Sequence, residues 1–143
     1  MLGVDLTNEG DRAMTVLSVE RLKGLDLYDR NSERVGVIRD VLLDQADGTI
    51  RYALIGTGGV LSALGIQDKL FAVPFDRLTV RTDRVRLAAE RAVLKDAPAF
   101  SAYQPPEFNR DYERKLTDFW GSRPYWEQAG YQMGDRQVKD VMS

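Results

Sequence analysis

The sequence predicts a small antiparallel β barrel or sandwich of six short strands, followed by a helical extension, in a chain of 143 residues. Three observations predict this fold class. Short runs of alternating apolar and polar residues recur between residues 25 and 87, turn residues separate these runs, and helical spacing begins only after residue 106. Strands that follow one another so closely, with little helix between them, argue against a βαβ fold.

The N-terminal segment is polar and aperiodic over residues 1–17, so we expect a flexible tail there. Ser18 is expected to cap one helical turn over residues 19–23, because its hydroxyl can accept a backbone N–H bond. Gly24 is expected to end that turn.

The first strands are expected at residues 25–28 and 35–43. The second run is apolar on both faces, which predicts a bend or a bulge that lets one strand serve two parts of a barrel wall. Asp47-Gly48 predicts a tight hairpin turn into a strand at 50–54, paired antiparallel with the strand before it.

Three more short strands are expected at residues 70–75, 78–80 and 85–87. Pro74 cannot donate to a ladder, which predicts an edge position for the first of them. Beyond residue 87, one or two helical turns are expected at 88–94.

A longer helix is expected at residues 107–120, where apolar residues recur at helical spacing, and Gly121 is expected to end it. We expect residues 132–143 to form a second flexible tail.

Composition excludes most enzyme classes. The chain has no cysteine and no histidine, so it has no thiolate or imidazole for nucleophilic, acid–base or zinc chemistry. The sequence predicts no catalytic residue, no metal site and no cofactor. A carboxylate-based hydrolase is the alternative, and no motif supports it.

The net charge and the lack of targeting signals bear on the partners and location of the chain. Its 20 basic and 22 acidic residues give a net charge of −2, too balanced for nucleic-acid binding by bulk electrostatics. No segment resembles a signal peptide or a membrane-spanning helix, so the chain is expected to be cytoplasmic.

Two motifs point to a ligand and are better explained by turns. Gly56-Thr57-Gly58-Gly59 fits neither the dinucleotide fingerprint nor the P-loop. Five aspartates could hold a hard cation, but their spacing differs from that of a calcium loop, and Asp29 and Asp47 are explained as turn residues. These aspartates are Asp26, Asp29, Asp40, Asp44 and Asp47.

Arginines alternate with apolar residues around the last two strands, which predicts one basic outer face. Its members are Arg77, Arg81, Arg84 and Arg86, with Arg91 close by in sequence. A solvated face explains them, and a site for RNA phosphates or an acidic partner is the sharper alternative.

Most aromatic residues of the chain lie between residues 100 and 131, too many to stay exposed on a soluble monomer. The candidate partner-binding residues, here called the aromatic set, are Phe108, Tyr112, Leu116, Phe119, Trp120, Tyr125 and Trp126. Docking on the chain's own barrel and a homodimer contact both explain the set, and the clustering favours the dimer slightly.

Several segments, in this order and spacing, resemble the PRC-barrel domain family, which includes the cytoplasmic domain of the photosynthetic reaction-centre H subunit and the C-terminal domain of the ribosome-maturation factor RimM. The segments are 22–29, 34–44, Asp47-Gly48-Thr49-Ile50-Arg51-Tyr52, Gly56-Thr57-Gly58-Gly59, Phe71-Ala72-Val73-Pro74-Phe75 and Leu94-Lys95-Asp96-Ala97-Pro98.

The resemblance implies a strongly bent six-stranded barrel at residues 18–100, with an aromatic-rich helical extension at 101–131. It implies a non-catalytic interaction or assembly module, similar to stand-alone bacterial members, some of them associated with stress responses. The protein partner is unknown. The alternative function is an RNA- or ribosome-associated factor that uses the arginine face.

Overall fold

Local sequence signals place nearly every element of the fold. The structure is a computed structural model, and it describes residues 16–131. The two predicted tails therefore lie outside the described residues, apart from residues 16 and 17. Its elements are α2 (Val19–Leu22), β1 (Asp26–Tyr28), β2 (Arg34–Leu43), β3 (Ile50–Gly56), η1 (Ser62–Leu64), β4 (Leu70–Pro74), η2 (Phe75–Arg77), β5 (Leu78–Val80), β6 (Arg84–Leu87), η3 (Arg91–Lys95), α3 (Arg110–Trp120) and η4 (Tyr125–Glu127).

The predicted caps and turns are confirmed. The Ser18 hydroxyl accepts the N–H of Arg21 at 3.0 Å at the start of α2. Gly48 takes a φ of 74° in the β2–β3 turn, and Gly121 a φ of 69° after α3, where a side chain would be strained. Helix α3 begins three residues later than predicted, because the Asn109 side chain accepts the N–H of Tyr112 and caps the helix there. The turn expected at 88–94 is the short 3₁₀ helix η3.

The six strands form one mixed sheet in the order β4-β3-β2-β1-β6-β5. The prediction of antiparallel strands throughout is wrong for one pair, because β1 and β6 run parallel. Turn residues set the direction of neighbours joined by a hairpin, whereas β1 and β6 are brought together only by the tertiary fold. The predicted barrel is also corrected, because the sheet is open. It ends at β4 and β5, and no ladder joins these two strands within residues 16–131.

Strand β2 has the irregularity that its two apolar faces predict. Its register against β3 shifts between Ile38 and Asp40 and again between Leu42 and Leu43. These shifts let successive side chains of one strand reach different parts of the interior. The strength of the bend stays a prediction.

A close approach of two backbones, at Gly36 of β2 and Gly56 of β3, was not predicted. A Cβ atom on Gly36 would lie 2.1 Å from the carbonyl oxygen of Gly56, too close for any side chain. Gly36 is therefore required by packing.

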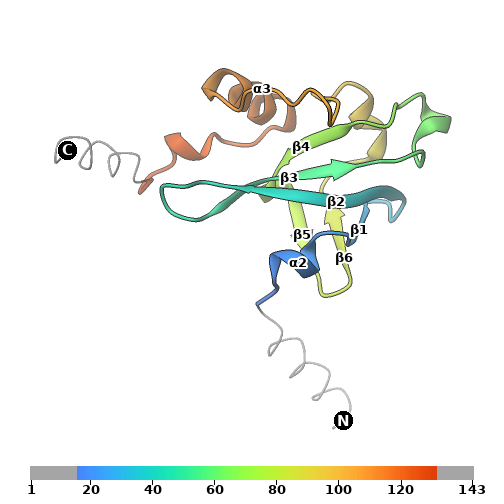
Figure 1. The fold of residues 1–143 in the computed structure, drawn as a ribbon, viewed down its shortest axis with the longest axis horizontal. Coiled ribbons are helices and arrows are strands. Elements are labelled where there is room, and N and C mark those ends of the chain that lie inside the picture. The colour runs from blue at the N-terminus through green and yellow to red at the C-terminus, as the bar shows by residue number, and fades with distance from the viewer. Residues whose placement is uncertain (1–15, 132–143) are drawn as a thin grey trace, which may run out of the picture.

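The sheet buries side chains on two sides. The main core takes fully buried side chains from every strand except β5, together with Leu22, Leu61, Leu94 and Trp120, and Leu78 and Val80 of β5 pack against it partly buried. In β3, Ala53 and Ile55 point into this core, whereas Tyr52 and Leu54 belong to a second cluster, with α3. Figure 1 shows α3 lying over β4, on the side of the sheet away from α2.

A buried carboxylate, Asp29, fastens the β1–β2 turn to η3. Its side chain accepts three backbone N–H bonds, from Asn31 and Glu33 at 2.9 Å and from Arg91 at 2.8 Å. Burial acts to raise the pKa of Asp29, but the bonds from Glu33, Arg91 and Asn31 outweigh it, so the pKa is lowered. Asp29 was predicted as a turn residue, and it also joins two segments that lie far apart in sequence.

Candidate interaction surfaces

Helix α3 lays its apolar stripe on the outer side of β3 and β4. Leu116 is fully buried against Tyr52, Ala72 and Phe100, with Phe108 packed beside them. At the other end of the helix, Trp120 enters the main core, and Phe119 packs against it. The extension thus docks in cis in the described chain.

None of the aromatic set is exposed. Leu116 and Trp120 are buried, and Phe108, Tyr112, Phe119, Tyr125 and Trp126 are half-buried. The sequence correctly singled out these residues as too apolar to remain in water, and docking in cis already covers much of their surface.

A buried carboxylate, Glu113, joins the extension to the sheet. Its Oε1 accepts the hydroxyl of Tyr52 at 2.8 Å and that of Tyr125 at 2.6 Å. Its Oε2 accepts an N–H of Arg110 at 3.2 Å, and the same guanidinium donates to the Tyr125 oxygen at 3.0 Å. Four polar side chains from β3, α3 and η4 therefore form one connected network, which satisfies groups that would be costly to bury alone.

The network changes the acidity of its tyrosines. Burial, and then the hydrogen bond to Glu113, raise the pKa of Tyr52 well above its usual range. The same two causes raise the pKa of Tyr125. Both hydroxyls therefore stay protonated and act as donors to the carboxylate.

Arg51 organises the end of the β2–β3 hairpin. Its Nη2 lies 2.8 Å from Asp47, and its Nε lies 3.5 Å from Asp44. Its guanidinium carbon stands 4.2 Å from the centre of the Tyr125 ring, a cation–π distance. The Tyr131 hydroxyl donates to Asp44 at 2.6 Å, so the last described residue of the extension also reaches the hairpin.

A groove of about 500 Å³ opens between this hairpin and the extension. We call it the hairpin groove. It is lined by Leu42, Leu43, Asp44, Gln45, Ala46, Arg51, Tyr52, Phe108, Glu113 and Tyr125.

The predicted basic face is divided by the structure. Arg77 turns toward the extension and donates to the Gly121 carbonyl at 2.9 Å and to the Ser122 hydroxyl at 3.1 Å. Ser122 in turn donates to Asp76 at 2.7 Å. Arg77 therefore holds the extension against the sheet at a second point, in addition to the Glu113 network.

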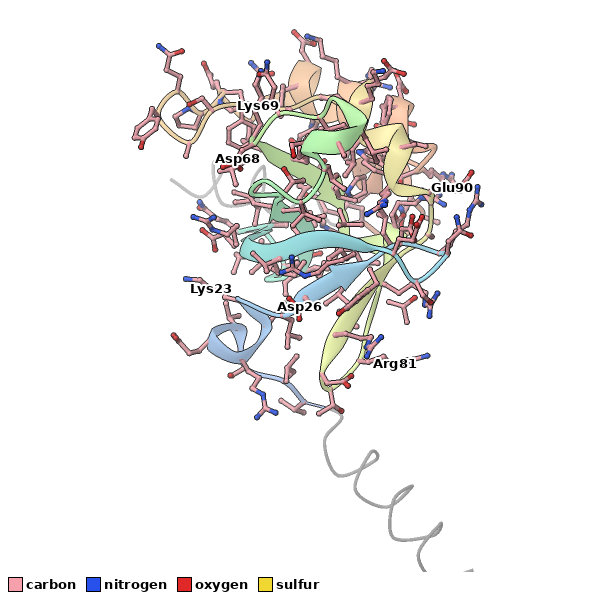
Figure 2. All side chains as sticks on the ribbon, turned by 90° about the vertical axis from the view of Figure 1, so that its right-hand side faces the viewer. Lys23, Asp26, Asp68, Lys69, Arg81 and Glu90 are labelled. Atoms are coloured by element: carbon pink, nitrogen blue, oxygen red, sulfur yellow. The ribbon has the colours of Figure 1, made fainter. Side chains whose placement is uncertain are left out.

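Arg84 and Arg86 are exposed on β6, and Arg81 is exposed just after β5. Arg84 stacks 4.7 Å from the Tyr28 ring, and Arg86 donates to the Arg30 carbonyl at 3.3 Å. Acidic residues share this side of the molecule, where Figure 2 shows Asp26 and Glu90 as well as Arg81. The face carries both signs of charge.

The five aspartates considered for a cation are dispersed, and within residues 16–131 no group of three acidic side chains could hold a metal ion. Only Asp44 and Asp47 come together, and both pair with Arg51. Gly58 of the glycine loop has a φ of 55°, which supports the turn explanation.

Sequence reasoning missed Arg51, Glu113 and Ser122. Tyr52 and Glu113 are 61 positions apart in sequence. An arginine in a strand and a glutamate in the first turn of a helix are both ordinary surface residues, so no local signal marks them as partners.

A family model, the PRC-barrel domain, matches residues 14–94. The chain belongs to the PRC-barrel domain family. No curated protein matches its sequence. The matched region ends within η3, so α3 and η4 lie beyond it, and in the described part of the chain no helix is long and apolar enough to cross a membrane.

Proposed function

We propose that this protein is a non-catalytic protein-interaction module, in which the sheet is a rigid scaffold and the extension completes the binding surface. Family membership supports an interaction module. The observation that carries the proposal is that the carboxylates lining the hairpin groove already accept hydrogen bonds within the chain. Glu113 uses both oxygens for three hydrogen bonds, and Asp44 accepts the Ala46 N–H and the Tyr131 hydroxyl. Each oxygen of these two carboxylates accepts a hydrogen bond from the chain itself, which supports a structural role for them over general acid–base catalysis.

Capture from native cytosol tests this proposal. The tagged full chain is used as bait at about 50 mM and about 500 mM salt, and each recovered protein is purified and tested for direct, saturable rebinding. A partner that rebinds at both salt concentrations supports the proposal, because contacts through apolar surface respond weakly to salt. If no recovered protein rebinds the purified chain, the proposal fails.

The arginine face favours the second candidate function, an RNA- or ribosome-associated factor. Arg81, Arg84 and Arg86 supply three exposed guanidiniums, and the nearby acidic residues Asp26 and Glu90 pair with two other arginines, Arg34 and Arg30. Recovery of RNA that is lost at high salt, and lost in the variant with all three arginines changed to Glu, would favour this alternative.

A homodimer formed through the aromatic set stays a proposal, and it concerns the oligomeric state of the protein. A second copy could use the set fully only if α3 left its own sheet, which would break the Tyr52–Glu113 bond. Light scattering after size exclusion, over a hundredfold range of concentration, decides between monomer and dimer. A cytoplasmic location and a role in stress responses also stay predictions.

A further inference from the structure

Strand β5 ends the sheet, and some of its backbone groups face outward from that edge. In the β5–β6 hairpin the Arg81 N–H donates to the Arg84 carbonyl at 2.8 Å. Bonded pairs alternate along an antiparallel ladder, so the backbone groups of Leu78 and Val80 point away from β6. The Leu78 N–H bonds to the Phe75 carbonyl. Within residues 16–131, the Leu78 carbonyl and both backbone groups of Val80 have no hydrogen-bond partner.

The opposite edge of the sheet is covered. Leu70 of β4 exchanges two backbone hydrogen bonds of 2.9 Å with Phe100, and Pro74 at the end of β4 has no N–H to offer. No segment of the described chain bridges β5 in this way, and β5 contains no proline. An uncovered edge can accept a further strand from another chain.

The inner side of β5 leaves apolar surface that a further strand would cover. Val85 and Leu87 of β6 are fully buried. Leu78 and Val80, directly opposite them on β5, pack against the main core but are only partly buried. The difference arises because no strand lies beyond β5. Every second side chain of an added strand would point to this side and extend the core.

The outer side of β5 and β6 carries positive charge that the chain does not neutralise. Each carboxylate that flanks these strands lies within 4 Å of an arginine, in the pairs Asp76–Arg77, Asp83–Arg84, Asp26–Arg34 and Glu90–Arg30. Arg81 and Arg86 form no ion pair within the described residues, and Arg86 donates to a backbone carbonyl. Figure 2 shows Arg81 pointing away from the ribbon at the tip of the β5–β6 hairpin. Thr79, which is exposed, lies opposite Arg86, so this side attracts carboxylates.

We propose that the edge of β5 takes an extended segment of a partner protein in which apolar residues alternate with aspartate or glutamate. The backbone of this segment bonds to Leu78 and Val80, its apolar side chains cover theirs, and its carboxylates face Arg81 and Arg86. A second copy of this chain fits less well, because pairing two β5 strands about their middle residue would set Arg77 opposite Arg81. This inference goes beyond the proposed function, because it assigns a docking edge within the sheet itself.

The first test measures peptide binding to the full chain by fluorescence anisotropy. The acidic peptide alternates valine with glutamate over about ten residues, and the basic peptide alternates valine with lysine. We expect the acidic peptide to bind at least tenfold more tightly than the basic one. Equal binding of the two, or no binding of the acidic peptide up to about 1 mM, would overturn the inference. Tighter binding of an oligouridylate than of the acidic peptide would also overturn it, in favour of a nucleic acid.

A pair of variants separates docking at β5 from general charge attraction. Arg81→Glu reverses a charge beside the edge, and Arg39→Glu makes the same change at an exposed arginine of β2, which β1 and β6 separate from β5. We expect Arg81→Glu to weaken binding of the acidic peptide at least fivefold and Arg39→Glu to change it less than twofold. An equal effect of the two variants would show that the peptide responds only to net charge.

Amide hydrogen exchange tests whether the peptide adds as a strand. The Val80 N–H has no partner in the described chain, and an added strand would supply one. We expect a saturating concentration of the acidic peptide to slow exchange of the Val80 amide at least tenfold, measured by nuclear magnetic resonance, and the basic peptide to leave it unchanged. Unchanged exchange in the saturated complex would exclude strand addition at this edge.

The same measurements distinguish failure of the inference from failure of the proposed function. If the captured partner binds Arg81→Glu as tightly as the wild-type chain and leaves Val80 exchange unchanged, the edge of β5 is not its docking surface, while the interaction module stands. If the wild-type chain rebinds no purified partner, the proposed function itself fails. Competition between the acidic peptide and the captured partner is the result we expect.

Discussion

Replacing Tyr52 by phenylalanine is expected to destabilise the protein by removing one buried hydrogen bond. The Tyr52 side chain is 3% exposed, and its hydroxyl lies 2.8 Å from Glu113 Oε1. The ring stays in place, with Phe108 at 6.1 Å and Tyr125 at 6.4 Å between ring centres. The variant therefore tests the hydroxyl and not the packing.

The expected loss follows from the charge of the acceptor. A hydrogen bond to a charged group contributes about 1.5–3 kcal/mol net, and the lost hydroxyl leaves Glu113 with Tyr125 and Arg110 as partners. For a chain of this length, about 4 °C of melting temperature corresponds to 1 kcal/mol. We expect Tyr52→Phe to lower the midpoint by about 6–12 °C.

The assay is thermal unfolding followed by tryptophan fluorescence, with Tyr103→Phe as the matched control. Tyr103 is 94% exposed, so its hydroxyl should contribute less than about 0.5 kcal/mol. A Tyr52→Phe variant no less stable than Tyr103→Phe would refute the argument that the Glu113 network fastens the extension to the sheet.

Alkaline pH gives an independent measurement of how the folded chain holds the Tyr52 hydroxyl. The pKa of Tyr52 is raised by burial and by Glu113, whereas the unfolded chain loses this proton near pH 10. The stability that the protonated Tyr52 hydroxyl contributes is thus fully present below about pH 10. It is lost as the pH rises further, because only the folded state keeps the proton. Above pH 10 the free energy of unfolding falls by about 1.4 kcal/mol per pH unit for this tyrosine. We expect Tyr52→Phe to make the plot of unfolding free energy against pH less steep by that amount. Equal slopes in both proteins would contradict the assignment.

Three further predictions concern the scaffold. Asp29→Asn should lower the free energy of unfolding by about 1–3 kcal/mol near neutral pH, because the NH2 group of asparagine would face a backbone N–H that the carboxylate now accepts. Its lowered pKa stabilises the wild-type chain above about pH 4, so this advantage should shrink as the pH falls through the folded pKa, which urea midpoints at pH 3 and pH 7 check. Leu116→Ala should cost about 2–5 kcal/mol, since Leu116 is fully buried under α3; a loss below about 1 kcal/mol by calorimetry would mean that the helix is not docked. Gly36→Ala should prevent a folded, soluble product, because its Cβ would lie 2.1 Å from the Gly56 oxygen; a normal circular dichroism melt would show that the two strands can separate there.

The sequence predicted the strands well because its signals there are local. Alternation placed β2 to β6 within a residue or two, and Asp47-Gly48 and Gly121 marked the ends that the structure has. Pro74 correctly indicated an edge strand, since β4 ends the sheet.

The candidate surfaces were predicted less completely. The aromatic set was recognised because clustered aromatics must leave water, but the sequence left docking in cis and a homodimer contact both open. In β3, Tyr52 and Leu54 lie in the cluster that α3 covers, whereas Ala53 and Ile55 lie in the main core. The alternating pattern shows that a strand has two faces, and the partner of each face depends on what packs there.

The sequence by itself determined where the strands lie along the chain, the turns between them and the helix of the extension, because each depends on residues near one another in the chain. Only the tertiary structure decided that β1 pairs parallel with β6, that Arg77 fastens the extension while Arg81 stays on the outer face, and that Glu113 meets Tyr52. Those contacts join segments dozens of residues apart, and packing of the whole domain selects them from many arrangements that satisfy the same local rules.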